Sequence, residues 1–129
     1  PQKPNPDKYI SSDGFEILVG KNNYQNDWLT TKFAEKTDIW FHTKNIPGSH
    51  VIVVANGKEV PNTTLTQAAT LAATNSKAAD SKQVAVDYTP VKYVKKPAGA
   101  KPGMVIYKTN KTAFVDPDFS LAEKLKGEK

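Results

Sequence analysis

The alternation of apolar and polar positions in the first third of the chain predicts a hairpin followed by a short helix. Two short alternating segments, residues 9–12 and 15–19, flank an Asp-Gly pair, and that pair is typical of a tight turn between antiparallel strands. The polar stretch that follows contains Asn26 and Asp27, either of which can cap a short helix.

The middle of the chain predicts two more strands and one long helix. Residues 37–43, TDIWFHT, alternate again, and residues 50–55 are β-branched enough for a central strand. Thr64 and Gln67 fit a capping box at the start of an alanine-rich helix over residues 65–79. Such a helix is slim and can lie close to a sheet.

The last third predicts short strands over residues 84–88, 91–94, 104–108 and 111–115. Most links between strands are as short as hairpin loops. We therefore expect an α+β fold, with a mixed, largely antiparallel sheet and one long and one short helix packed on it.

The length of 129 residues fits one domain. We expect residues 1–8, which are rich in proline, to be a linker, residues 9–119 to be the domain, and residues 120–129 to be a frayed tail. The chain opens on Pro1 without a methionine, which indicates a fragment of a longer protein. Apolar runs fall short of the roughly 20 residues that a membrane helix needs, so we expect no membrane partner.

Composition narrows the chemistry. The absence of cysteine excludes disulfides, cysteine–zinc sites and thiol nucleophiles. The formal charge is +5, every basic residue is lysine, and seven lysines against the single acid Asp87 lie between Lys82 and Lys111. Such local basic surface is typical of proteins that bind polyanions. Without arginine, contact with nucleic acid should follow the backbone and its shape more than the base sequence.

Alternation places Asp38, Trp40 and His42 on one face of the predicted strand. An Asp–His pair could act in catalysis, but Ser49 is the nearest nucleophile and no nucleophile elbow surrounds it. His50 could complete a metal site with Asp38 and His42, yet the chain contains no further histidine.

Besides catalysis and metal binding, the strand predicted over residues 37–43 could serve in the recognition of RNA. Trp40 or His42 could stack on an unpaired base while Lys21 and Lys44 hold phosphate. The alternative is that Trp40 belongs to the core and His42 is a hydrogen-bonded buried group. A Gly-led polar loop that contains Asn22 and Asn23 could also seat an anion, although an ordinary turn explains it as well.

A second basic surface follows later in the chain. Tyrosines interleave with four lysines, and the stiff loop between Pro97 and Pro102 would have to gather those lysines: Lys92, Lys95, Lys96 and Lys101. A solvated lysine-rich hairpin is the alternative. If four lysines each neutralise one phosphate, log K should fall with log salt at a slope of roughly −3 to −4.

Read in order, the segments DGFEILVGKNNYQNDWLTTKFAEKTDIWFHTKNIPGSHVIV, TLTQAATLAATNSKA and VDYTPVKYVKKPAGAKPGMVIY resemble the NFACT-R family of RNA-binding domains, in a low-GC Gram-positive form. The D-x-W-x-H pattern of that family falls on Asp38, Trp40 and His42. The resemblance implies one module of a ribosome quality-control factor. Members of the family bind large ribosomal subunits obstructed by peptidyl-tRNA, and bacterial members promote alanine tailing.

The resulting hypothesis is a cytoplasmic, non-enzymatic RNA-binding module with tRNA and the 50S subunit and its ribosomal RNA as partners, and with no cofactor or metal. The candidate RNA contacts are Asp38, Trp40, His42, Lys44 and His50, with Asp38 orienting His42. The candidate phosphate contacts are Lys21, Asn22, Asn23, Lys92, Lys95, Lys96 and Lys101. Two rivals stay open: a surface-associated adhesin domain that binds fibronectin, a label attached to relatives, and a small hydrolase that uses Asp38 and His42.

Overall fold

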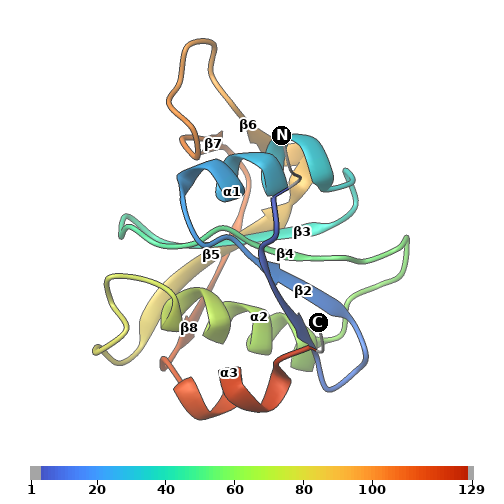
Figure 1. Ribbon diagram of the computed structural model, residues 1–129, viewed down its shortest axis with the longest axis vertical. Coiled ribbons are helices and arrows are strands. Elements are labelled where there is room, and N and C mark those ends of the chain that lie inside the picture. Colours follow the sequence, from blue (N-terminus) through green and yellow to red (C-terminus); the bar gives the residue numbers. More distant parts are fainter. Residues whose placement is uncertain (1–3, 128–129) are drawn as a thin grey trace.

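The computed structural model describes residues 4–127, which form a six-stranded antiparallel sheet with helices on both faces (Figure 1). The strand order is β1-β2-β4-β3-β5-β8, and a separate two-stranded ribbon pairs β6 with β7. The expected α+β class is confirmed, and every strand pair is antiparallel. The strands are β1 (Asp7–Ile10), β2 (Glu16–Val19), β3 (Ile39–Thr43), β4 (Val51–Val53), β5 (Val84–Pro90), β6 (Val94–Lys95), β7 (Ile106–Tyr107) and β8 (Lys111–Val115).

The helices are α1 (Asn23–Trp28), which continues as the π-helical turn η1 (Leu29–Phe33), then α2 (Asn62–Thr74), the 3₁₀ turn η2 (Val91–Tyr93) and α3 (Phe119–Leu125). Figure 1 places α2 and α3 below the sheet and α1 above it, beside the β6–β7 ribbon.

The first hairpin has the predicted turn. Gly14 has φ +87°, a conformation that a glycine adopts without steric penalty, and the amide of Ser11 donates to the carbonyl of Phe15. However, β1 already begins at Asp7, because Asp7 and Lys8 pair with Val19 and Leu18. The expected linker over residues 1–8 is therefore wrong for its last two residues, and residues 1–3 lie outside the described part.

The lower face of the sheet carries the larger core, into which α2 packs its small side chains. Ala68, Ala69, Ala72 and Ala73 are fully buried there, so the helix lies close to the strands as expected. The helix starts earlier than predicted, at Asn62. The hydroxyl of Thr64 does not cap it but donates to the carboxylate of Asp13 and accepts from the hydroxyl of Ser11, both in the first hairpin.

The C-terminal segment also belongs to this core. The frayed tail expected over residues 120–129 is wrong as far as Gly127, where the described part ends. The Asp118 side chain caps α3 by accepting from the Leu121 amide. Leu125 is buried, and the amide of Gly127 donates to the carbonyl of Lys8 in β1. Apolar side chains spaced along α3 thus hold it against α2 and β1.

The upper face carries a second, smaller core around Leu18, Trp40 and Ile52. It is covered by α1, η1 and the β6–β7 ribbon. The predicted cap at Asn26 or Asp27 is wrong: Asn22 caps α1 by accepting from the Gln25 amide, so the helix begins at Asn23. Asn26 then lies inside the helix, where it turns toward the sheet.

Candidate nucleic-acid interface

The predicted alternation along β3 is confirmed. Trp40 lies in the upper core, whereas Ile39 and Phe41 pack on the opposite side with α2. His42 shares the face of Trp40, and the two rings lie parallel at 5.8 Å between centroids. The sequence therefore places the tryptophan and the histidine correctly on one face.

Asp38 has a different role from the one expected. It lies just before β3 and is 1% exposed. Its two carboxylate oxygens accept from the backbone amides of Ala55, at 2.9 Å, and Glu35, at 2.8 Å. Asp38 therefore ties the start of β3 to the ends of two neighbouring segments. The expectation that it orients His42 is wrong, because both oxygens are engaged by backbone N–H groups.

His50 joins four segments of the upper face. Its Nδ1 accepts from the indole N–H of Trp40, at 3.1 Å, and from the hydroxyl of Thr30, at 2.7 Å. Its Nε2 lies 3.0 Å from the carbonyl oxygen of Gly103. Because a carbonyl can only accept, Nε2 carries the hydrogen and the ring is a neutral imidazole with both nitrogens satisfied. His50 thus anchors the loop that links β6 to β7.

Burial is the main reason why the pKa of His50 falls to about 4, and the neighbouring His42 pushes it in the same direction. The carbonyl of Gly103 and the carboxylate of Asp27 oppose this shift but do not overcome it. Burial also lowers the pKa of His42, against the opposing influence of Thr43, Gly48 and Asp87. Both imidazoles are therefore uncharged near neutral pH.

Asp27 is the second anchor of the same loop. One of its carboxylate oxygens accepts from the amide of Gly103 at 2.9 Å and from the ammonium of Lys96 at 2.8 Å. Burial by itself would raise the pKa of Asp27, but these two donors and the charge of Lys96 bring it below its usual value. Gly103 is thus held through its N–H by Asp27 and through its carbonyl by His50.

A buried carboxylate lies on the other side of His42. Asp87 in β5 is directly opposite His42 in the strand register and is 1% exposed. It accepts from the phenol of Tyr107 at 2.6 Å and from the hydroxyl of Thr112 at 2.7 Å. Lys44 lies 3.4 Å from it as an ion pair. Burial, followed by the bond to Asp87, raises the pKa of the Tyr107 phenol.

Several of the residues described above line a cavity of about 600 Å³, here called the aromatic cavity. Its more buried lining consists of Trp40, His42, His50 and Tyr107, and its exposed lining includes Asn45, Pro47, Lys101 and Met104. Trp40 and His50 are almost fully buried, so they support the cavity, and direct contact falls to less buried groups such as His42. Asp38 is equally buried and does not line the cavity.

Three of the predicted phosphate contacts come together beside η1. These three, Lys92, Lys95 and Lys96, line a smaller cavity of about 320 Å³, here called the lysine hollow. Lys36, which was not predicted, also lines it. The loop therefore gathers its charges as expected, except that Lys101 lies at the aromatic cavity. Val105 lines both cavities, so they adjoin.

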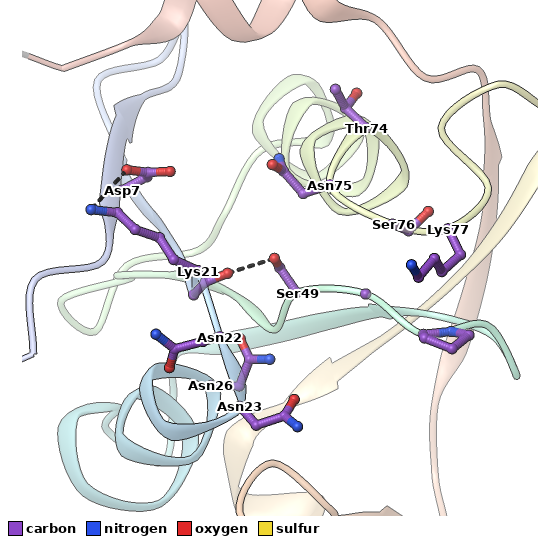
Figure 2. Close-up of a pocket in the computed structure, with 13 residues that line it drawn as sticks. Asp7, Lys21, Asn22, Asn23, Asn26, Ser49, Thr74, Asn75, Ser76 and Lys77 are labelled. Atoms are coloured by element: carbon purple, nitrogen blue, oxygen red, sulfur yellow. Dashed lines mark hydrogen bonds and ion pairs between the residues drawn. The ribbon is translucent and has the colours of Figure 1, made fainter.

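The remaining predicted contacts, Lys21, Asn22 and Asn23, lie on the other side of the aromatic cavity. They line a third cavity, also about 600 Å³, here called the polar cavity, which runs between the start of α1 and the end of α2 (Figure 2). Asn23, Asn26, Pro47 and Gly48 line both this cavity and the aromatic one. The three cavities thus adjoin one another around the β6–β7 loop and the β3–β4 turn.

Carboxylates neutralise some of the candidate lysines. Lys21 pairs with Asp7 at 3.5 Å, Lys44 with Asp87, and Lys96 with Asp27. Within residues 4–127, Lys92, Lys95 and Lys101 form no ion pair. The field of this surface therefore depends on these three residues together with Lys36 of the lysine hollow and Lys77 of the polar cavity, which also form no ion pair within the described residues. Lys92 also lies over the ring of Tyr93, at 5.2 Å.

The described residues contain no group of three or more His, Cys, Asp or Glu side chains that could hold a metal ion. Over the same part of the chain, no helix is long and apolar enough to cross a membrane.

Sequence reasoning missed the anchors of the loop. Asp27 looked like a helix cap, and Gly103 looked like an ordinary loop glycine. The bond from His50 to Gly103 joins residues 53 positions apart, and the one from Asp27 to Gly103 joins residues 76 positions apart. No local pattern marks contacts at such separations.

Residues 7–109 match the family described as the NFACT protein RNA binding domain. The chain is 52% identical to the Rqc2 homolog RqcH of Bacillus subtilis over 98% of its own length, and 48% identical to the Rqc2 homolog RqcH of Streptococcus suis over 90%. It spans only about a fifth of these curated relatives, 22% and 21%.

The same arrangement of elements occurs in a solved structure, the C-terminal part of the fibronectin/fibrinogen-binding protein from Streptococcus suis. The TM-score is 0.92, with 44% sequence identity over 98% of this chain and 51% of that one. A more distant relative is the ribosome quality control complex subunit 2 of Schizosaccharomyces pombe, 40% identical over 59% of this chain and 8% of that protein. The chain belongs to the NFACT RNA-binding domain family, whose named relatives here are ribosome quality-control proteins.

Proposed function

We propose that this domain binds tRNA and the RNA of the large ribosomal subunit, as the RNA-holding module of a cytoplasmic ribosome quality-control factor. In that setting it supports rescue of stalled ribosomes and alanine tailing, and it acts by binding, without chemistry of its own. The family match supports RNA as the ligand, and the names of the relatives support the setting.

The observation that carries the proposal is the convergence of lysines in the lysine hollow. Lys36 precedes β3, whereas Lys92 and Lys95 follow β5, and the fold brings their side chains to one concave surface. Several ammonium groups around one hollow suit the phosphates of a folded RNA, which a lysine meets as a point charge. The β6–β7 loop keeps its backbone position through His50 and Asp27, so the lysines sit on a prearranged support.

The test is binding of the 129-residue chain to tRNA and to isolated 50S subunits, measured by filter binding over a range of KCl concentrations. We expect log K to fall with log salt at a slope of roughly −3 to −4. The double variant Lys92→Gln, Lys95→Gln should bind more weakly and reduce that slope by about 2, since each lysine accounts for about one unit.

The matched control is Lys58→Gln with Lys124→Gln, which removes the same charge from exposed lysines outside the three cavities. Lys124 belongs to α3, on the opposite face of the sheet. Equal losses in the two double variants would mean that net charge alone attracts RNA. Affinity that does not respond to salt or to loss of the hollow's lysines would overturn the proposal.

One specific observation favours a second function, because the structurally similar Streptococcus suis protein is described as fibronectin- and fibrinogen-binding. Immobilised fibronectin distinguishes the two functions. If the chain binds fibronectin and binds no RNA at low salt, the adhesin function replaces the RNA one.

A further inference from the structure

The polar cavity is the part of this surface whose role the RNA-binding proposal leaves open. Its lining combines the loop after β2 with Thr74, Asn75, Ser76 and Lys77 at the end of α2, a segment with no RNA role in the sequence reasoning. Figure 2 shows Lys21 on one side of the cavity, where its ammonium pairs with Asp7, and Lys77 on the other, with Ser49 between them. The cavity continues directly into the aromatic cavity.

The polar cavity is rich in hydrogen-bond donors that the protein does not use. Among the described residues, Lys77 forms no ion pair, and the side-chain amide N–H groups of Asn22, Asn23 and Asn26 donate to no other protein atom. The one carboxylate of the lining, Asp7, pairs with Lys21 at 3.5 Å, and both side chains are more than a third exposed. One unpaired ammonium group, a second one paired with a partly exposed carboxylate, and three amide groups together favour an anionic ligand that also accepts hydrogen bonds.

The cavity is preformed by a clamp between two segments. The amide of Ser49 donates to the carbonyl of Asn75 at 3.1 Å, and the amide of Lys77 donates to the carbonyl of Pro47 at 2.9 Å. Gly48 fits between them, because a Cβ there would lie 2.8 Å from the Cβ of Ser76. The backbone from which Lys77 extends is therefore fixed before any ligand arrives.

The aromatic cavity offers a different lining. Ile46, Pro47, Met104 and Val105 supply apolar surface, while His42 and Asn45 supply donors and acceptors. A nucleobase has the matching character, with flat apolar faces and a polar edge. Lys101 lies at this cavity and Lys77 at the polar one. Each cavity therefore offers a lysine to a phosphate, one on either side of a base held between them.

Resting on the proposed RNA binding, we infer that the two cavities together hold an unpaired stretch of RNA. One base enters the aromatic cavity, and the adjoining ribose and phosphate lie in the polar cavity against Lys77, Lys21 and the asparagine amides. Each cavity has a volume within the range of ligand sites. A base that is paired in a duplex cannot enter, because its edge and faces are already covered.

The test is fluorescence anisotropy of the 129-residue chain with a short unpaired oligoribonucleotide, compared with a blunt duplex of the same sequence. We expect the unpaired strand to bind more tightly. Lys77→Gln should weaken that binding several-fold and reduce the salt slope by about 0.7, the value for one phosphate contact to a single strand. Lys82→Gln is the matched control, since it removes the same charge from an exposed lysine of the same connection, outside both cavities.

A second variant pair tests the base site. Met104 is 61% exposed, so Met104→Glu places a negative charge at the mouth of the aromatic cavity without disturbing the core, and Met104→Gln is its uncharged control. We expect the glutamate to abolish most binding of the unpaired strand and the glutamine to preserve it. In ¹⁵N-edited NMR spectra, the side-chain amide signals of Asn22 and Asn23 should shift when the oligonucleotide is added.

The outcomes separate this inference from the broader function. Equal binding of duplex and unpaired strand, or equal effects of Lys77→Gln and Lys82→Gln, would overturn the unpaired-strand site. If tRNA binding still depended on Lys92 and Lys95, RNA binding itself would stand. Binding of free nucleoside monophosphate as tight as that of the oligonucleotide would point to a small-molecule site and would equally overturn the inference. If the chain binds no RNA of any kind, both the unpaired-strand site and the proposed RNA-binding function are overturned.

Discussion

The imidazole of His50 donates a hydrogen bond of 3.0 Å to the backbone carbonyl of Gly103, and so joins the start of β4 to the part of the β6–β7 loop that leads into β7. The other ring nitrogen accepts from Trp40 and Thr30. One neutral side chain therefore supports both the floor of the aromatic cavity and the loop at its edge.

Replacement of His50 should loosen this loop. His50→Ala leaves the Trp40 indole N–H and the Gly103 carbonyl without partners and removes a buried ring. We expect the free energy of unfolding to fall by about 3 kcal/mol. Urea denaturation would measure the loss, and hydrogen exchange should show faster exchange in residues 95–106. Exchange that stays as slow as in the parent chain would show that the Asp27 contact holds the loop by itself.

The pH dependence of stability should reveal the same residue. The pKa of His50 falls from 6.5 in the unfolded chain to about 4 in the folded one, so between these values the unfolded state binds more protons. The stabilisation is fully present above pH 6.5, and it is lost as pH falls toward 4, by on the order of 3 kcal/mol. His42, whose pKa is also lowered, contributes with the same sign.

Urea midpoints at several pH values between 4 and 7 would measure this dependence. The variant His50→Gln cannot titrate, and its stability profile should be flatter in that range. If the parent chain and the variant have parallel profiles, His50 is not the group responsible.

Asp38 should act on stability and not on RNA contact. Asp38→Ala leaves the buried amides of Ala55 and Glu35 without an acceptor, which should cost about 3 kcal/mol in thermal or urea unfolding. Asp38→Asn keeps one acceptor oxygen and should cost less. At a temperature where the asparagine variant is folded, its affinity for RNA should equal that of the parent chain. A loss of affinity in that folded variant would make Asp38 part of the contact surface after all.

Gly48 should not tolerate a side chain unless the neighbouring Ser76 is replaced by a smaller residue. In Gly48→Ala, the new methyl group would lie 2.8 Å from the Cβ of Ser76 and 3.1 Å from the hydroxyl of Thr43, so we expect a loss of about 1–3 kcal/mol. Ser76→Gly removes the closest of these atoms. In a double-mutant cycle, the second change should recover part of the loss caused by the first. Additive effects in urea unfolding would contradict the steric explanation.

The sequence predicts best where the signal is local. Alternation over TDIWFHT assigns Trp40 and His42 to one face and Phe41 to the other, because successive side chains of a strand point to opposite sides. The Asp13-Gly14 turn is also predicted correctly, because the geometry of a tight turn depends on adjacent residues. The lysine-rich loop was also marked by local charge.

The turn before β4 shows where local rules fail. Pro47 and Gly48 suit the centre of a type II turn, which requires a positive φ at the glycine, but the residue with positive φ in this turn is Asn45, at 55°. Gly48 is small for a different reason, which is its contact with Ser76 across the molecule. The partners of Asp38, His50 and Asp27 likewise come from distant segments, so no spacing rule could reveal them.

The double anchoring of Gly103 has a further consequence. Both bonds use backbone atoms of the loop, its N–H to Asp27 and its C=O to His50, and Lys96 is the one loop side chain that shares the Asp27 anchor among the described residues, so the attachment does not depend on the other side chains that the loop displays. Lys95 and Lys101 could be exchanged for acidic or aromatic residues while the scaffold beneath keeps its shape. Substitution of a few exposed residues on this anchored loop should therefore change which ligand the domain prefers without changing its fold.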